Sequence, residues 1–305
     1  MNYFFIFMLS AYFLIVQGKP MDTQTWENEE NCGLTMYDNG TFKLTKRGNR
    51  KVAAGEFPWL VRIGVIDVEA NEPVFHCEGA LIHRQIVISA TDCGTVNQVA
   101  RVGENNIDEN VDCELSVCPP PPQDIKIRKH TVADNSNDSG KSEISIIELE
   151  APVEYNDFVR PICLSQEDIP LPNIKAQRGT GAKWGWGDTL PGLPYVNNAT
   201  SSRSLIHVKT HVLDKEECRK SYVPELDEDH YCVEYPQEEP CAVPLGAPLI
   251  AYKEVKGVNR AFLVSVASHN QSTCKTAETR PVVYKRAGRF IFSCIFNAIS
   301  NLFGK

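Results

Sequence analysis

From residue 56 onward, the chain is a succession of short apolar runs separated by turn residues. Three of these runs span residues 59–65 (WLVRIGV), 85–89 (QIVIS) and 261–266 (AFLVSV). Runs that are rich in β-branched residues and alternate with turn signals are typical of the strands of antiparallel sandwiches and barrels. The sequence therefore predicts an all-β fold.

Only one stretch, residues 290–303, has helical periodicity. Its apolar positions that share one helix face are Ile291, Ile295, Ala298 and Leu302. The only cations at its ends are Arg289 and Lys305. Helices that lie on a membrane surface are usually rich in lysine and arginine on their polar face. We therefore expect this helix to dock on the β-structure rather than on a membrane.

Residues 1–18 combine an apolar stretch with small residues at its end, which is typical of a signal peptide. A transmembrane anchor is the weaker interpretation, because the stretch is interrupted and no basic flank precedes it. No later stretch is long and apolar enough to span a bilayer. We therefore predict a secreted, extracellular protein with a polar segment at residues 19–51 and a main domain at residues 52–305.

The chain contains eleven cysteines, which in a secreted protein predict several disulfides. Four Asn-x-Ser/Thr sequons predict glycosylation, at Asn39, Asn137, Asn198 and Asn270. The net charge is −8, and the longest basic run, residues 46–51, contains no aromatic residue. A nucleic-acid partner is therefore not expected.

Six segments, taken in order, resemble landmarks of the chymotrypsin/trypsin family of serine proteases. They are GEFPW (55–59), HCEGALI with SATDC (76–93), SEISII (142–147), RPICL (160–164), GWG (185–187) and CAVPLGAPL (241–249). Each is weak alone, but their joint order is specific, and the resemblance covers roughly residues 52–300. It implies two six-stranded antiparallel β-barrels with a cleft between them and a C-terminal helix.

A further segment, DCELSVCPP (112–120), is similar to an extra disulfide loop of arthropod clip-domain proteases of the Easter and prophenoloxidase-activating type. A clip domain needs six cysteines, and only Cys32 precedes the protease-like region, so we expect no clip domain here. The resemblance implies five disulfides, which are Cys77–Cys93, Cys113–Cys118, Cys218–Cys232, Cys241–Cys274 and Cys32–Cys163. Cys294 is left over, and a buried free thiol is favoured over an intermolecular bridge.

Catalysis in this family needs a serine nucleophile, a histidine base and an aspartate that orients the histidine. The resemblance places Asp92 at the histidine position, Glu143 at the aspartate position and Leu245 at the serine position. Leucine has no nucleophilic atom, which excludes an acyl-enzyme. The chain is therefore predicted to be a pseudoenzyme.

The resemblance implies losses beyond the triad. Val243 replaces a glycine of the oxyanion hole, and Pro244 replaces the aspartate that pairs with the new N-terminus on activation. Val282 replaces a glycine that keeps the specificity pocket open, so its branched side chain should fill part of that pocket. The activation segment is also changed, since KRGN at 46–49 stands where relatives have Ile-Val-Gly-Gly. We expect a cut in this basic run to cause no activation-like transition.

Two interpretations of the vacated catalytic centre stay open. In the family fold the positions of Asp92 and Glu143 face each other, so the two carboxylates could share one space and titrate as a pair. Alternatively, Asp92 turns toward solvent while Glu143 accepts hydrogen bonds from the backbone. A nearby acidic loop matches the calcium loop of some relatives, with Glu104, Asp112 and Glu114 as weak candidate ligands. Apart from calcium, no cofactor is expected.

The resemblance implies a non-catalytic homolog that binds extracellular proteases, zymogens or protease substrates. Such a chain would modulate a proteolytic cascade of immune, melanization or developmental type, as a cofactor or as a decoy, including one in venom or another secreted fluid. One alternative is a hydrolase with relocated catalytic residues, for which His76 is nearest in sequence to the cleft segments. Another is a structural secreted protein, covalently joined through Cys294.

Overall fold

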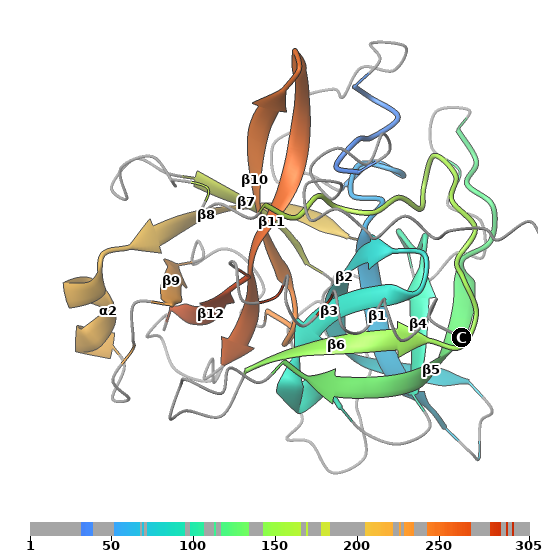
Figure 1. Ribbon diagram of the computed structural model, residues 1–305, viewed down its shortest axis with the longest axis horizontal. Helices are drawn as coiled ribbons and strands as arrows, with labels where there is room; N and C mark the ends of the chain where they lie inside the picture. Colours follow the sequence, from blue (N-terminus) through green and yellow to red (C-terminus); the bar gives the residue numbers. More distant parts are fainter. Residues whose placement is uncertain are drawn as a thin grey trace, which may run out of the picture.

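The computed structural model describes most of the chain from residue 52 onward, together with a short N-terminal segment. The described residues are 32–38, 52–67, 69, 72–94, 98–106, 113, 117–133, 143–165, 169, 178–183, 205–221, 226, 229–234, 243–269, 281–287, 291 and 295. Their strands form two sheets, and each sheet closes into a six-stranded barrel (Figure 1). The predicted all-β fold with two antiparallel barrels is confirmed.

The first barrel contains strands β1 to β6, arranged in the order β1-β2-β3-β6-β5-β4 with antiparallel neighbours. Their bounds are β1 Leu60–Ile66, β2 Pro73–His83, β3 Ile86–Ala90, β4 Gln98–Val102, β5 Gln123–Val132 and β6 Ile144–Leu149. Every residue of β3 and β6 is buried. Along β5, exposed charged residues alternate with half-buried Ile125 and Ile127, as the period of two in a half-covered strand requires.

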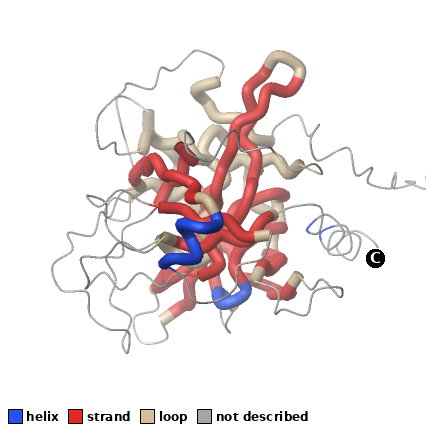
Figure 2. Tube along the Cα trace, turned by 90° about the vertical axis from the view of Figure 1, so that its left-hand side faces the viewer, coloured by secondary structure: helices blue, strands red, loops and turns tan. Residues whose placement is uncertain are grey.

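The second barrel contains strands β7 to β12, arranged in the order β10-β11-β12-β9-β8-β7. Their bounds are β7 Arg178–Lys183, β8 Ile206–Leu213, β9 His230–Glu234, β10 Pro248–Val255, β11 Val258–His269 and β12 Val282–Arg286. The hairpin of β10 and β11 projects from the body of the molecule in both views (Figures 1 and 2). Its turn residues, Lys256 and Gly257, have φ values of 53° and 79°, the backbone that a two-residue hairpin turn needs.

The largest apolar cluster is shared between the two barrels. It joins Trp59 and Ile88 of the first barrel to Ile250 and Leu263 of the second. Ile291 and Ile295 are helical, fully buried and part of the same cluster. This burial agrees with the expectation that the C-terminal helix docks on the barrels. No helix in the described part of the chain is long and apolar enough to cross a membrane.

The structure also contains a helix that the sequence pattern does not predict. Helix α2 spans Lys215–Ser221, between β8 and β9. The expectation that only residues 290–303 are helical is therefore wrong. The helix has seven residues and no apolar stripe, so periodicity could not reveal it. Its charges do fit a helix, with Glu216 and Glu217 in the first turn and Arg219 and Lys220 in the last.

The N-terminal segment 32–38 is docked on the second barrel. Cys32 is disulfide-bonded to Cys163, and the backbone of Gly33 accepts a hydrogen bond from Ala261 N (2.9 Å) and donates one to Pro161 O (2.8 Å). Three further disulfides join Cys77 to Cys93, Cys113 to Cys118 and Cys218 to Cys232. These bridges are four of the five pairs that the resemblance implies.

Several sequence predictions concern residues outside the described part of the chain. These are the signal peptide at 1–18, the basic run at 46–51, the pair Cys241–Cys274, the thiol of Cys294, the four sequons, and the candidate ligands Asp112 and Glu114. They stay predictions.

Candidate functional site

The segment that carries Asp92 is a single 3-10 turn, η1 (Thr91–Cys93), at the end of β3. The backbone N–H of Thr91 donates to the carbonyl of Glu143, at 2.9 Å, which ties this turn to the start of β6. The disulfide between Cys93 and Cys77 fixes the other side of the turn on β2. The fold therefore brings the positions of Asp92 and Glu143 together, as the sequence predicts.

Leu245 reaches the same place from the second barrel. Its backbone forms a bridge with Cys77 of β2, and its carbonyl accepts a hydrogen bond from Glu78 N at 2.8 Å. The leucine side chain is half-buried and packs against the core of the first barrel. The segments that carry the three positions assigned by the resemblance to a catalytic triad are therefore joined to one another, through β2 and through the bond between Thr91 and Glu143.

Glu143 is paired with a histidine that sequence analysis did not identify. Nε2 of His230 lies 3.0 and 3.1 Å from the two carboxylate oxygens of Glu143, and because a carboxylate only accepts, Nε2 donates. The histidine side chain is 8% exposed and the glutamate side chain 20%. His230 begins β9 of the second barrel, and Glu143 precedes β6 of the first, so this hydrogen-bonded pair links the two barrels.

Of the two interpretations of the vacated centre, the second is supported for Asp92 only. Asp92 is exposed, as that interpretation expects. The carboxylate of Glu143 is bound by an imidazole, a partner that neither interpretation included. No spacing along the sequence links Glu143 to His230, because the two residues are 87 positions apart and lie on different barrels. Only the packing of one barrel on the other brings them together.

We expect a double-mutant cycle of Glu143→Gln and His230→Gln to give a coupling energy of about 1–2 kcal/mol, measured by urea unfolding. The hydrogen bond is made to the carboxylate of Glu143, which is largely shielded from water. Water should therefore not compensate for the bond when it is removed. The matched control is the exposed pair Arg160–Asp157, whose aspartate side chain is 57% exposed. That pair should couple by less than about 1 kcal/mol. Equal coupling in the two cycles would contradict a special role for the pair between the barrels.

Two valines stand at the positions that the resemblance assigns to the oxyanion glycine and to the pocket glycine, and both are buried. Val243 and Val282 belong to one apolar cluster in the second barrel. Its other buried members are Val212, Val233, Ala247, Leu249, Ala267 and Tyr284. The side chain of Val282 is therefore packed among apolar neighbours, and its role as the filler of a specificity pocket stays a prediction.

The loop around Leu245 is a tight turn. Ala247 N donates to the carbonyl of Pro244 at 3.2 Å, and Gly246 has a φ of +79°. A Cβ atom at Gly246 would overlap the Glu78 carbonyl oxygen and Ser89 Oγ. Ser89 Oγ itself donates to the same Glu78 carbonyl at 2.6 Å. The turn is therefore in direct contact with the first barrel.

Two half-buried histidines near this region have lowered pKa values. The pKa of His76 lies below its ordinary value because burial disfavours the imidazolium, an effect larger than the opposing hydrogen bond with the Val74 backbone. Burial also lowers the pKa of His130, whose ring lies directly against Gly94, the residue after η1. Packing therefore disfavours the charged form of both rings, as expected for side chains with a structural role in the first barrel.

The candidate calcium ligand Glu104 is held by internal donors. Its carboxylate accepts hydrogen bonds from Asn105 N (3.1 Å) and Asn106 N (3.2 Å) and forms an ion pair with Arg101 (3.1 Å). The pKa of Arg101 is raised, mainly by its hydrogen bonds with Asp124. Within the described ranges, no group of three or more His, Cys, Asp or Glu residues could hold a metal ion.

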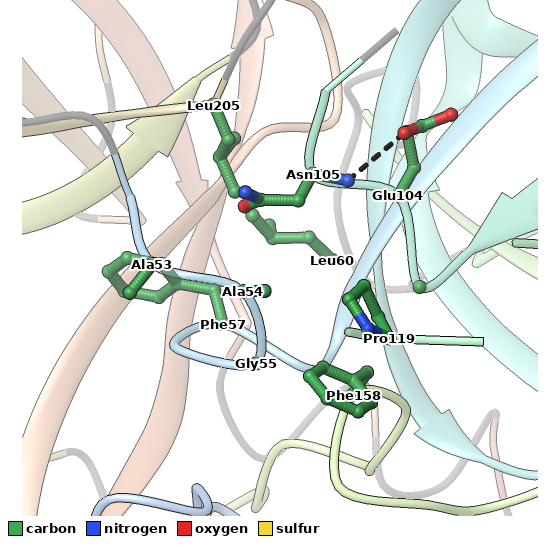
Figure 3. Close-up of a pocket in the computed structure, with 11 residues that line it drawn as sticks. Ala53, Ala54, Gly55, Phe57, Leu60, Glu104, Asn105, Pro119, Phe158 and Leu205 are labelled. Carbon is green, nitrogen blue, oxygen red and sulfur yellow. Dashed lines mark hydrogen bonds between the residues drawn. The ribbon is translucent and has the colours of Figure 1, made fainter. Parts of the chain in front are cut away.

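Next to Glu104 lies a small pocket, shown in Figure 3. It is lined by Ala53, Ala54, Gly55, Phe57, Leu60, Gly103, Glu104, Asn105, Pro119, Phe158 and Leu205. The cavity volume is about 10 Å³, which is the space of about one water molecule. It is too small to be a ligand site.

Comparison with known proteins agrees with this geometry. A family model described as Trypsin matches residues 46–291. The chain is 28% identical to serine protease ea of Drosophila melanogaster, covering 80% of this chain and 65% of that protein. It is also 28% identical to phenoloxidase-activating factor 1 of Holotrichia diomphalia, covering 77% and 65%. The chain therefore spans just under two thirds of the length of these relatives.

Among solved structures, the fold is similar to that of the Drosophila Grass clip serine protease of the Toll pathway. The TM-score is 0.74 at 20% identity, over 91% of this chain and 77% of that chain. The family model covers most of the residues in both barrels, and the observed barrel topology is the one that the resemblance implies. The chain belongs to the trypsin family of serine proteases and is similar to insect clip-domain proteases.

Proposed function

We propose that this chain is a secreted, non-catalytic member of the trypsin family that binds extracellular proteases, their zymogens or their substrates. The observation that carries the proposal is Leu245, which stands at the position that the resemblance assigns to the nucleophile and whose backbone is bonded to Cys77 and Glu78 of β2. An acyl-enzyme needs an oxygen or sulfur nucleophile, and a leucine side chain supplies neither.

The neighbouring residues support the same proposal. Asp92 and Glu143 are carboxylates at positions where an imidazole and its orienting aspartate are required. Val243 is a buried member of an apolar cluster, and it precedes a proline that has no N–H to donate. The loop at 243–247 therefore differs from the family loop both in the nucleophile and in the residues that shape the backbone around an oxyanion.

One alternative is a relocated catalytic dyad, because His230 and Glu143 form a histidine–carboxylate pair. Two observations weigh against it. Nε2 of His230 donates to Glu143, and Nδ1 is buried, so neither ring nitrogen is placed to take a proton from a solvent-side nucleophile. We therefore propose that this pair is structural.

The relatives support the proposed setting. Several carry names that refer to phenoloxidase activation, and one is a venom serine protease of Bombus ignitus. We propose that this chain acts in an insect-type extracellular cascade, as a cofactor that assembles an active complex or as a decoy for an active relative. Four disulfides among the described residues fit an oxidising, extracellular setting.

We expect the purified protein, with or without trypsin treatment, to show neither cleavage of fluorogenic peptides nor covalent labelling by a fluorophosphonate. The Leu245→Ser variant should also stay inactive, because Asp92 cannot act as the imidazole base, and misplaced oxyanion donors would add a cost of up to about 10²–10³ in rate. Bovine trypsin in the same assay is the positive control. Stoichiometric labelling of the unmodified chain would overturn the proposal, and labelling of the serine variant alone would show that the loop geometry is intact. Pull-down from the native fluid would then identify the partner.

A further inference from the structure

A second cavity, larger than the one in Figure 3, lies in the second barrel between α2, β9 and β12. Its volume is about 150 Å³. The described residues that line it are Val212, Leu213, Lys215, Cys218, Arg219, Leu226, His230, Tyr231, Cys232 and Arg286. None of the positions that the resemblance assigns to catalysis is among them. The cavity therefore has its own lining, and His230 connects it to Glu143.

The residues that line the cavity include both apolar and cationic side chains. Val212, Leu226 and the disulfide between Cys218 and Cys232 supply apolar surface. Three further lining residues are cationic, namely Lys215, Arg219 and Arg286, and no aspartate or glutamate is among the described lining residues. This gathering of positive charge contrasts with the net charge of −8 for the whole chain.

The cationic side chains come from elements that are held in place. Lys215 and Arg219 are four positions apart on α2, so they share one face of the helix, and Cys218 links the helix to β9 through its disulfide. The guanidinium of Arg286 lies over the ring of Tyr231, at 4.9 Å from the ring centre. The acidic residues Glu216 and Glu217 are on the same helix but do not line the cavity.

The size of the cavity limits the ligand. An apolar cavity of about 150 Å³ in a protein can hold a molecule the size of benzene. An arginine at the wall matches a carboxylate, because its planar fork can donate two parallel hydrogen bonds to the two oxygens. A ligand that satisfies both parts of the site has a single ring or a branched chain next to one carboxylate.

We propose that this cavity binds a small carboxylate that carries a benzene-sized apolar group. The apolar group would occupy the space above Val212 and Leu226, and the carboxylate would meet Arg219 and Arg286. His230 lines the same cavity while its Nε2 holds Glu143, so an occupied cavity would lie directly behind the link between the two barrels. This site does not depend on whether the chain is an active peptidase.

The test is isothermal titration of the purified chain with three probes, which are phenylacetate, benzyl alcohol and acetate. We expect phenylacetate to bind at least tenfold more tightly than either of the others, because only this probe has both the ring and the carboxylate. Equal binding of phenylacetate and benzyl alcohol, or no binding of phenylacetate, would overturn the proposal. The titration uses no peptidase readout, so its failure is distinguishable from a failure of the proposed function.

Two exposed residues of α2 provide a matched pair of variants. Arg219→Gln should weaken phenylacetate binding about tenfold, whereas Lys220→Gln should leave it unchanged, because Lys220 is next in the chain and does not line the cavity. Both side chains are exposed, so both variants should keep the melting temperature of the unmodified chain. An equal loss of binding in the two variants would show only a general effect of charge and would contradict the site.

Discussion

Gly246→Ala should destabilise the native state by about 2–5 kcal/mol, one of the largest effects expected for a single substitution in this chain. Two causes act together. Gly246 has a φ of +79°, which costs a residue with a Cβ atom about 1–2 kcal/mol. The new methyl group would also overlap the Glu78 carbonyl oxygen and Ser89 Oγ, and relief of such overpacking costs about 1–3 kcal/mol.

The control for this prediction is Gly257→Ala. Gly257 has the same φ of +79°, but no atom lies within 4 Å of the place where its Cβ would be. This variant should therefore lose only the backbone contribution, about 1–2 kcal/mol. Chemical denaturation of both variants separates the two causes. If the two losses were equal, the contact between Gly246 and the first barrel would be unimportant for stability.

Removal of the bridge between Cys32 and Cys163, by replacing both with alanine, should cost about 5 kcal/mol of unfolding free energy. The bridge joins residues 131 positions apart, and the entropy that a cross-link removes from the unfolded chain grows with the length of the closed loop. Cys32 and Cys163 are also fully buried together with Phe262, so the substitution removes packing as well.

The matched control removes the bridge between Cys113 and Cys118, which are five positions apart. The same relation gives about 2 kcal/mol for so short a loop, so the two double variants should differ by about 3 kcal/mol in urea unfolding. Similar losses would show that loop closure does not determine the stability. The long bridge has a second readout, because it should hold the N-terminal segment on the body after a cut at 46–51. Non-reducing mass analysis would detect this linked species.

The architecture was largely predictable from the sequence. The runs at 59–65, 85–89 and 261–266 lie within or next to β1, β3 and β11, because β-branched residues between turn signals leave few alternatives to a strand. The burial of Ile291 and Ile295 was predictable for a similar reason, since their spacing of four places them on one helix face. These features depend on local sequence, which is why a single chain is enough to find them.

The features that sequence analysis missed depend on contacts between distant segments. His230 meets Glu143 only because two barrels pack together, and no local pattern marks either residue as a partner. The cavity beside α2 takes its lining from β8, α2, β9 and β12, and α2 is too short to show periodicity. The candidate triad positions were found through resemblance alone. Two carboxylates and a leucine that are far apart in the sequence do not form a recognisable motif.

The apolar cluster shared by Trp59, Ile88, Ile250, Leu263 and the C-terminal helix has a mechanical consequence. Neither barrel can rotate away from the other without exposing this cluster to water, so the space between the barrels cannot open and close as a hinge does. If a partner binds there, as proposed above, it would have to fit walls of fixed separation.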